Sequence, residues 1–155
     1  MSNFQDYIDV MEAFNHHHVE YLVVGAYAMG NFGYTRSTHD IDLWVKKTIK
    51  NSAKICKALD EFGVPFLIKP EDFMENNSVI QIGIAPTRID ILTDIDGVAF
   101  DDAWKKRVNG KILGVDTGII SLNDLILNKT VSNRSKDKLD LIQLQELKSA
   151  LKAKK

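Results

Sequence analysis

The sequence predicts an α/β (α+β) fold, in which a mixed sheet of about four to five strands is flanked by helices. Short apolar runs of strand length alternate along the chain with longer amphipathic segments. The chain has 155 residues, of which 45% are hydrophobic and 26% charged, which is the size and composition of one globular domain. We therefore expect a single domain over residues 1–155, with C-terminal helices at about 121–151 packed on it.

Helices are predicted where apolar side chains recur at spacings of three and four and where helix-capping residues flank them. Thr48 or Asn51 is positioned to cap the helix that Gly63 ends. Ser121-Leu-Asn-Asp124 has the form of a capping box, with aspartate in place of the usual glutamate, and begins another helix. The predicted helices cover residues 4–17, 26–31, 48 or 51 to 62, 100–107, 121–131 and 135–151, with one helical turn at 70–74.

Strands are predicted where short runs are rich in apolar, β-branched and aromatic residues. Residues 79–84 and 88–92 are separated by Ala85-Pro86-Thr87, which is the spacing of an antiparallel hairpin. Residues 108–115 are interpreted as one further strand. The predicted strands cover residues 21–24, 40–45, 79–84, 88–92 and 108–115.

Composition excludes several classes of protein. The longest uncharged run, residues 21–35, has 15 residues, which is too short to span a bilayer, so no membrane is expected as a partner. The single cysteine, Cys56, excludes an internal disulfide and a cysteine-rich zinc site, and we expect it to be a buried free thiol. Acidic residues stand near the N-terminus, where a signal peptide carries basic and apolar ones, so a cytoplasmic location is expected.

Charge is distributed unevenly along the chain. Residues 129–155 carry eight basic and three acidic side chains, a balance of +5, and since the net charge is −1 the other 128 residues carry −6. This asymmetry is compatible with a polyanion site beside a cation site. On charge alone, a solvated helix with a lysine-rich tail is the simpler interpretation.

Two carboxylates on one predicted strand indicate a metal site. Side chains i and i+2 of a strand share a face, so Asp40 and Asp42 stand side by side while Ile41 enters the core. Like charges this close disfavour joint ionisation unless a cation neutralises them. Hard oxygen ligands of this kind suit Mg²⁺, which completes its coordination with water and substrate phosphates.

A third carboxylate, Asp90, lies between Ile89 and Ile91 in a later predicted strand. If that strand lies beside the strand of Asp40, three carboxylates converge. This is enough to hold two metal ions about 3.5–4 Å apart, the arrangement that supports in-line displacement at phosphorus. We therefore expect two Mg²⁺ ions, with Mn²⁺ as an alternative, held by Asp40, Asp42 and Asp90.

Phosphate-binding elements accompany these acids. Gly25 and Ala26 join an apolar strand to a helix, and the free backbone N–H groups at such a junction bind phosphate. A bulky side chain at either position would hold the phosphates away. Arg36 offers a forked donor to phosphate.

These motifs together resemble the DNA polymerase β-type nucleotidyltransferase superfamily. The likeness is carried by Gly25-Ala26, by Asp40-Ile-Asp42 and by the later strand with Asp90. Within the superfamily, the chain is similar to the small, minimal nucleotidyltransferases of bacteria and archaea, which include the AbiEii-type toxins of toxin–antitoxin systems. The narrower likeness is carried by Arg36-x-Thr38, by Arg88-Ile-Asp90-Ile-Leu92 and by the run from Ser121 to Asp140.

The resemblance implies transfer of a nucleoside monophosphate from an NTP to an acceptor, with release of pyrophosphate. It implies that Asp40 and Asp42 bind both metal ions and that Asp90 holds the catalytic metal and helps deprotonate the acceptor. It also implies a polar network of Arg134, Lys136, Asp137 and Asp140 beside the site. The nucleotide-binding residues that we expect are Gly25, Ala26, Arg36, Thr38, Lys129, Arg134, Lys136 and Asp137.

The chain departs from the superfamily pattern at one position and in size. The superfamily usually has Gly-Ser or Gly-Gly where this chain has Gly25-Ala26, so the hydroxyl is lost and the N–H is kept. The chain lacks room for the large helical acceptor domain of many members. The acceptor is therefore expected to be tRNA, a protein or a small molecule. A cognate antitoxin is a further expected partner, and the chain is expected to be a monomer or a homodimer. A nucleotide-binding or interaction protein that keeps the fold without turnover is the alternative.

Several other features are interpreted as structural. Consecutive residues on a helix point about 100° apart, so His16-His17-His18 is taken as a solvated helix end. Asp94-Ile95-Asp96 precedes a glycine and is taken as a turn. His39 is expected to face away from the acid pair, and Trp44 and Trp104 are expected in the core.

Overall fold

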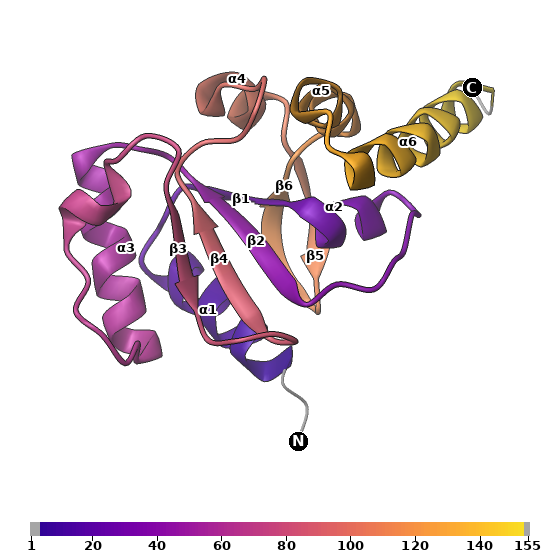
Figure 1. The fold of residues 1–155 in the computed structure, drawn as a ribbon. Coiled ribbons are helices and arrows are strands. Elements are labelled where there is room, and N and C mark those ends of the chain that lie inside the picture. Colours follow the sequence, from indigo (N-terminus) through magenta and orange to yellow (C-terminus); the bar gives the residue numbers. More distant parts are fainter. Residues whose placement is uncertain (1–3, 154–155) are drawn as a thin grey trace.

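A computed structural model gives the structure of the chain and describes residues 4–153. It contains a six-stranded mixed sheet flanked by helices, which confirms the predicted fold class (Figure 1). The other residues of the predicted domain, 1–3 and 154–155, lie outside the described residues. None of the helices within residues 4–153 has the length and apolar character needed to cross a membrane.

The first two strands of the chain lie at the centre of the sheet. Its strands are β1 (Tyr21–Val24), β2 (Asp40–Val45), β3 (Val79–Ile82), β4 (Arg88–Leu92), β5 (Val108–Ile112) and β6 (Val115–Ile119). They lie in the order β3-β4-β2-β1-β6-β5, with β2 parallel to β4 and β1 parallel to β6. The other neighbours are antiparallel, which confirms the hairpin predicted for β3 and β4. The backbone of β2 is therefore paired on both sides.

The helices begin and end close to their predicted positions. They are α1 (Phe4–His16), α2 (Gly25–Asn31), α3 (Ile49–Phe62), α4 (Phe100–Lys105), α5 (Leu122–Ser132) and α6 (Ser135–Ala153), with a 3₁₀ turn at Pro70–Phe73. Thr48 caps α3 by accepting a hydrogen bond from the amide of Asn51. Ser121 caps α5 in the same way, through the amide of Asp124. Figure 1 shows α1 packed beside α3, and α6 extending away from the sheet.

The prediction of one strand over residues 108–115 is wrong, because the chain reverses there. β5 ends at Ile112 and β6 begins at Val115, and the two strands pair antiparallel across Leu113-Gly114. Both turn residues have positive φ, 51° and 83°, which is the conformation of the tight turns that match the twist of a hairpin. Glycine is common in that conformation and leucine is not, so Gly114 indicates a turn whereas Leu113 indicates a continuing strand. The sheet consequently has six strands rather than four to five.

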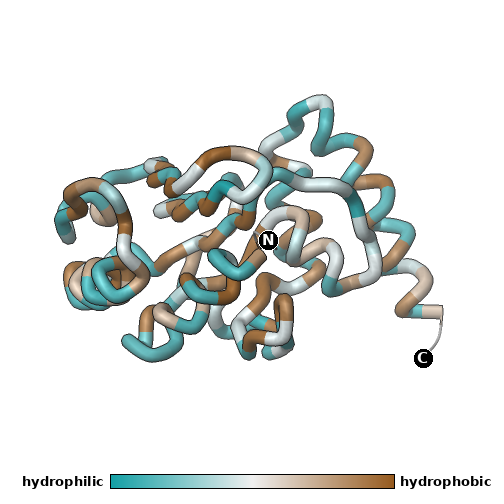
Figure 2. The backbone as a smooth tube through the Cα atoms, turned by 90° about the horizontal axis from the view of Figure 1, so that it is seen from below, coloured by the Kyte–Doolittle hydropathy of each residue, from teal (hydrophilic) through white to brown (hydrophobic). Residues whose placement is uncertain are grey.

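The core follows from the alternation of side chains along the strands. Ile41, Leu43 and Val45 of β2 are fully buried on one face, while the two aspartates of this strand point to the other. Trp44 is buried and packs edge-on against Phe100, as expected of a core tryptophan. Figure 2 shows the hydrophobic residues of the strands in the middle of the molecule. Two expectations need correction, since Cys56 and Trp104 are only half-buried at the margin of this core.

Asn51 fixes the start of α3 to the chain around it. Its amide oxygen accepts from the backbone N–H of Glu20 at 2.8 Å, and its amide nitrogen donates to the carbonyls of Glu20 and Lys46 at 3.0 and 2.9 Å. The side chain is 2% exposed. Asn51 therefore forms hydrogen bonds with three backbone groups at a position that is shielded from water.

We expect Asn51→Ala to lower the free energy of unfolding by about 2–4 kcal/mol, because it leaves these buried backbone groups without partners. Urea denaturation measures the change. Asn109→Ala is the matched control: this asparagine is exposed on the edge strand β5, and its loss should change stability by less than about 0.5 kcal/mol. Equal effects of the two substitutions would contradict the prediction.

Candidate active site

The three predicted metal ligands meet at the centre of the sheet. β2 and β4 run parallel and in register, with Asp42 opposite Asp90 and Asp40 opposite Arg88. Oxygen atoms of Asp40, Asp42 and Asp90 all lie within 4.8 Å of one another. The predicted convergence of the three carboxylates is thus confirmed, and it follows from the register, since facing residues of neighbouring strands project to the same side.

Arg88 lies among these carboxylates. Its Nη2 atom is 2.8 Å from Oδ2 of Asp40 and 3.0 Å from Oδ2 of Asp90, and its Nε atom is 2.8 Å from Oδ1 of Asp90. A planar guanidinium is suited to such a bidentate contact. Arg88 lies two residues before Asp90 in β4, and this parity predicts that the two side chains share a face. Its place among the acids could therefore have been predicted from the sequence.

The crowding of negative charge perturbs the protonation of two of the acids. Burial raises the pKa of Asp42 to about 7, and the neighbouring carboxylates of Asp40 and Asp90 add to the effect. Burial also raises the pKa of Asp90, with a contribution from Asp40, whereas the hydrogen bonds from Arg88 act in the opposite direction. A site that resists ionisation in this way gains from a bound cation.

Gly25 brings the end of β1 against the acids. Its φ is +71°, a conformation that strongly favours glycine, and a Cβ atom at this position would collide with the carboxylate of Asp42. The predicted role of small residues at this junction is to leave room for phosphate. The structure shows that the absence of a side chain at Gly25 also leaves room for Asp42.

A cleft of about 470 Å³ opens over the three acids. Its walls also contain Gly25, and the basic residues Lys129, Arg134 and Lys136 from α5, α6 and the turn between them. Gln81, which lies opposite Asp90 in the register of β3 and β4, lines it too and was missed by the sequence analysis. The cleft thus carries carboxylates and cations side by side, and its volume is that of a small-molecule site.

Four of the predicted nucleotide-binding residues do not line this cleft, and one of them, Asp137, is fully buried. Ala26, Arg36 and Thr38 line a neighbouring pocket of about 620 Å³. His39 lines this pocket as well, so it is not part of the acidic cleft, as expected. Thr38 still touches the acids, because its hydroxyl donates a hydrogen bond to Oδ1 of Asp40 at 3.2 Å.

Lys129 is the centre of a buried charge network. Its Nζ atom is 3.0 Å from Asp137 and 3.4 Å from Asp140, and all three side chains are at most 6% exposed. Arg134 bonds Asp137 at 2.8 Å, and Arg36 donates to Asp140 at 3.3 Å. The network joins Arg134, Asp137 and Asp140 as expected, through Lys129, and it ties α5 and α6 to the segment that precedes β2. Lys136 was also expected in it but lines the cleft instead.

This network holds Asp137 in its ionised form. Burial alone would raise its pKa, but hydrogen bonds from Arg134, Ser132 and Lys129 outweigh that effect and hold the pKa well below its usual range. The ammonium of Lys129 faces these two acids and also lines the cleft. Its charge acts on Asp42, where it partly opposes the rise in pKa.

The second Asp-x-Asp motif forms a turn, as predicted. Ile95 and Val98 pair across Asp96-Gly97. Asp94 is held by the Nζ atom of Lys47 at 2.6 Å and by the amide of Asn77 at 2.7 Å. The turn nevertheless lines the margin of the acidic cleft, which the sequence alone did not indicate.

The donor set of the cleft fits a hard divalent cation. All three ligand groups are carboxylates, and no nitrogen or sulfur ligand is among them. Mg²⁺ binds through one or two carboxylates together with water and substrate phosphates, which the open cleft can admit. The raised pKa of Asp42 gives such an ion a further role, because bound positive charge would favour its ionised form.

Comparison with known proteins supports an enzymatic role for this region. Residues 3–152 match the family described as "Nucleotidyltransferase of unknown function (DUF6036)". No curated protein gives a significant match. The family match covers all six strands and the whole acidic cleft.

We expect Gly25→Ala to lower the free energy of unfolding by about 1–3 kcal/mol, because alanine is strained at positive φ and its Cβ atom displaces the Asp42 carboxylate. Gly30→Ala is the control within the same helix, where a Cβ atom meets open space and alanine favours the helix. Urea denaturation of both variants tests the difference. If Gly30→Ala were as destabilised as Gly25→Ala, the loss of stability could not be assigned to the positive φ of Gly25 or to the clash with Asp42.

We also expect the stability of the metal-free protein to fall as pH rises from about 4 to about 7 and then to level off. The pKa of Asp42 is about 7 in the folded chain, above the unfolded value, so the unfolded chain loses this proton first. Asp42→Asn should flatten this slope and raise the free energy of unfolding at pH 8 by about 1–3 kcal/mol, a range reduced for partial solvent exposure. Denaturation at several pH values measures it, with exposed Asp60→Asn as the control that should keep the slope.

Proposed function

The chain belongs to this family of nucleotidyltransferases, and we propose that it transfers a nucleoside monophosphate from an NTP to an acceptor hydroxyl. In this reaction the acceptor oxygen bonds to the α-phosphorus of the NTP while the bond from that phosphorus to the pyrophosphate oxygen breaks. The acceptor proton leaves to a base, and pyrophosphate is released. The observation that carries the proposal is the convergence of Asp40, Asp42 and Asp90 in an open cleft.

The acidic and the basic residues of the cleft support two different roles, metal binding and phosphate binding. The acids on β2 and β4 would hold Mg²⁺, which when bound supplies positive charge to the attacking and leaving oxygens. Lys129, Arg134 and Lys136 line the other wall and would contact the negative phosphates of an NTP. Asp90 is the candidate base for the acceptor proton, since its pKa is raised by burial and by Asp40.

Arg88 fits this proposal as a residue that changes partners. In the structure its guanidinium neutralises Asp40 and Asp90, the positions that cations would share. Binding of metal requires these ion pairs to open, and the side chain, 30% exposed, has access to solvent. Arg88 would then be able to donate a hydrogen bond to a phosphate oxygen of the NTP. The same side chain would thus contact the acids without metal and the nucleotide when metal is bound.

The identity of the acceptor stays a prediction. A hydroxyl of RNA, of a protein or of a small molecule fits the chemistry equally, because the described residues form one open cleft above the acids. The toxin–antitoxin role, and with it a cognate antitoxin, rests on the resemblance to the minimal nucleotidyltransferases of the polymerase β type. The dependence on Mg²⁺ rests on the donor set.

A nucleotide-binding protein without turnover is the second candidate. Two observations favour it: Arg88 already pairs with two of the three acids, and Ala26 lines the neighbouring pocket and brings no hydroxyl to the cleft. Such a protein would bind ATP without releasing pyrophosphate. The retention of three ligating carboxylates argues for the enzyme, because binding alone needs fewer.

We expect the protein to release pyrophosphate from at least one of the four NTPs in the presence of Mg²⁺ or Mn²⁺ and an acceptor drawn from tRNA, protein or small alcohols. Asp90→Asn should lower the rate by about 10²- to 10⁴-fold, because it removes both a metal ligand and the candidate base. Pyrophosphate release and transfer of label from the α-phosphate are the measurements.

Asp116→Asn removes a carboxylate that is 83% exposed on β6 and should leave the rate unchanged. Binding of ATP with metal, measured by calorimetry, separates the two candidate functions. Wild-type protein that binds ATP but releases no pyrophosphate with any of these acceptors would establish the binding protein and refute the enzyme. A rate unchanged by Asp90→Asn would refute the assigned site.

A further inference from the structure

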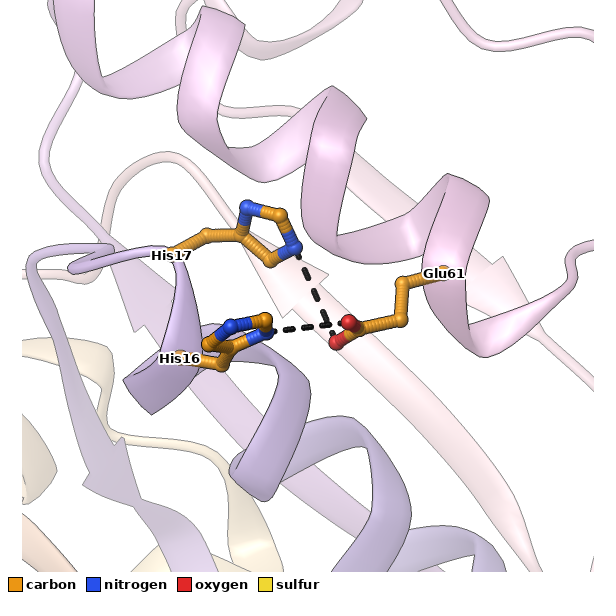
Figure 3. A group of neighbouring side chains, drawn as sticks. All are labelled: His16, His17 and Glu61. Carbon is orange, nitrogen blue, oxygen red and sulfur yellow. Dashed lines mark hydrogen bonds and ion pairs between the residues drawn. The ribbon is translucent and has the colours of Figure 1, made fainter.

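Two histidines and a glutamate, none of which lines the acidic cleft, meet near the ends of α1 and α3 (Figure 3). α1 ends at His16, and His17 and His18 lie in the turn that follows. Because the chain leaves the helix here, the 100° rotation between neighbouring helical residues does not apply. His16 and His17 both turn toward Glu61, near the end of α3. His16 and His18 are exposed, as expected of a solvated helix end, whereas His17 is half-buried and departs from that interpretation.

The distances in this cluster leave one nitrogen without a partner. Nδ1 of His16 is 2.9 Å from Oε1 of Glu61, which is an ordinary hydrogen bond. Nε2 of His17 is 3.6 Å from Oε2 of Glu61, beyond hydrogen-bond range. That nitrogen is buried and has no hydrogen-bond partner among the described residues. A simple ion pair therefore accounts for His16 and leaves His17 unexplained.

A shared metal ion would account for the spacing. The three ligand atoms lie within 4.8 Å of one another. A tetrahedral ion with bonds of about 2.0–2.1 Å holds its ligand atoms about 3.3 Å apart, close to the separation of His17 and Glu61. Figure 3 shows both imidazole rings turned toward the carboxylate of Glu61, so one ion placed between the three side chains would have all three as ligands.

The ligand types favour zinc over magnesium. Two imidazole nitrogens with one carboxylate form a common Zn²⁺ ligand set, whereas Mg²⁺ prefers oxygen alone. A cleft of about 460 Å³ beside His16 and Glu61 offers room for water to complete the coordination. The carboxylates of Asp9 and Glu12 line the same cleft and add negative charge.

We propose that His16, His17 and Glu61 bind one Zn²⁺ ion, separate from the acidic cleft. The ion joins the end of α1 to the end of α3, two helices that pack against each other. This site is independent of the nucleotidyltransfer chemistry, since it shares no residue with the three acids of the sheet.

Calorimetric titration with Zn²⁺ in the presence of excess Mg²⁺ tests the proposal. We expect one high-affinity equivalent in the wild-type protein and at least about a tenfold loss of affinity in His17→Gln and in Glu61→Gln, since each loses one ligand. Substitution with Co²⁺ should give the visible absorption of a low-symmetry, four-coordinate ion, which the two variants should lose. The unfolding midpoint should rise with Zn²⁺ in the wild-type protein only.

His18→Asn is the matched control. It removes an imidazole from the same tripeptide, and asparagine tolerates the positive φ of 58° at this exposed position. This variant and Asp90→Asn should both bind Zn²⁺ as the wild-type protein does. Unfolding of the metal-free variants shows whether each keeps its fold. If His17→Gln is destabilised, the Zn²⁺ affinity of Glu61→Gln tests the proposal instead, because Glu61 is exposed.

Three results would overturn the proposal. Wild-type affinity in Glu61→Gln would exclude the cluster as the site. A loss in His18→Asn as large as in His17→Gln would indicate adventitious binding by surface imidazoles. A loss in Asp90→Asn would place the ion at the acids of the sheet.

Discussion

The mutual repulsion of three carboxylates is the constraint around which this molecule is arranged. Parallel pairing of β2 and β4 in register places Asp40, Asp42 and Asp90 within 4.8 Å of one another, and burial adds to the cost of ionising Asp42 and Asp90. The ion pairs of Arg88 offset part of that cost. Gly25 completes the arrangement, because only a residue without a side chain lets β1 end against Asp42. Each of these features makes the centre of the sheet a place where added positive charge is favourable.

A second layer of charge holds the helices that form the opposite wall of the cleft. Lys129 pairs with Asp137 and Asp140 in a nearly dry environment, and Arg36 joins them from the segment before β2. Buried pairs of this kind contribute little net stability, but removal of one partner is costly. The network therefore specifies where α5 and α6 sit relative to β2. The cations and the acids of the cleft are in this way positioned by one connected set of contacts.

Strand parity was enough to place Asp40, Asp42 and Asp90 opposite to their apolar neighbours, because it follows from the residues themselves. Their convergence also requires β2 and β4 to be neighbours, which the residues alone left conditional. The same parity applies to Arg88, which could have been predicted but was not. Other features depend on information that a single sequence lacks. Leu113 in a hairpin turn contradicts its own conformational preference, and the partners of Lys129 depend on how α5 and α6 pack. His17 meets Glu61 in the turn after α1, and this contact depends on how α1 packs against α3.

The central place of β2 in the sheet has a consequence for how the molecule opens. Hydrogen bonds on both sides hold this strand, so its amide protons are released only when a large part of the sheet comes apart. The outer helix α6 extends from the body and can fray at far lower cost. Fluctuations that admit and discharge a ligand can therefore occur at the rim, while the geometry of Asp40 and Asp42 persists until the domain melts as a whole.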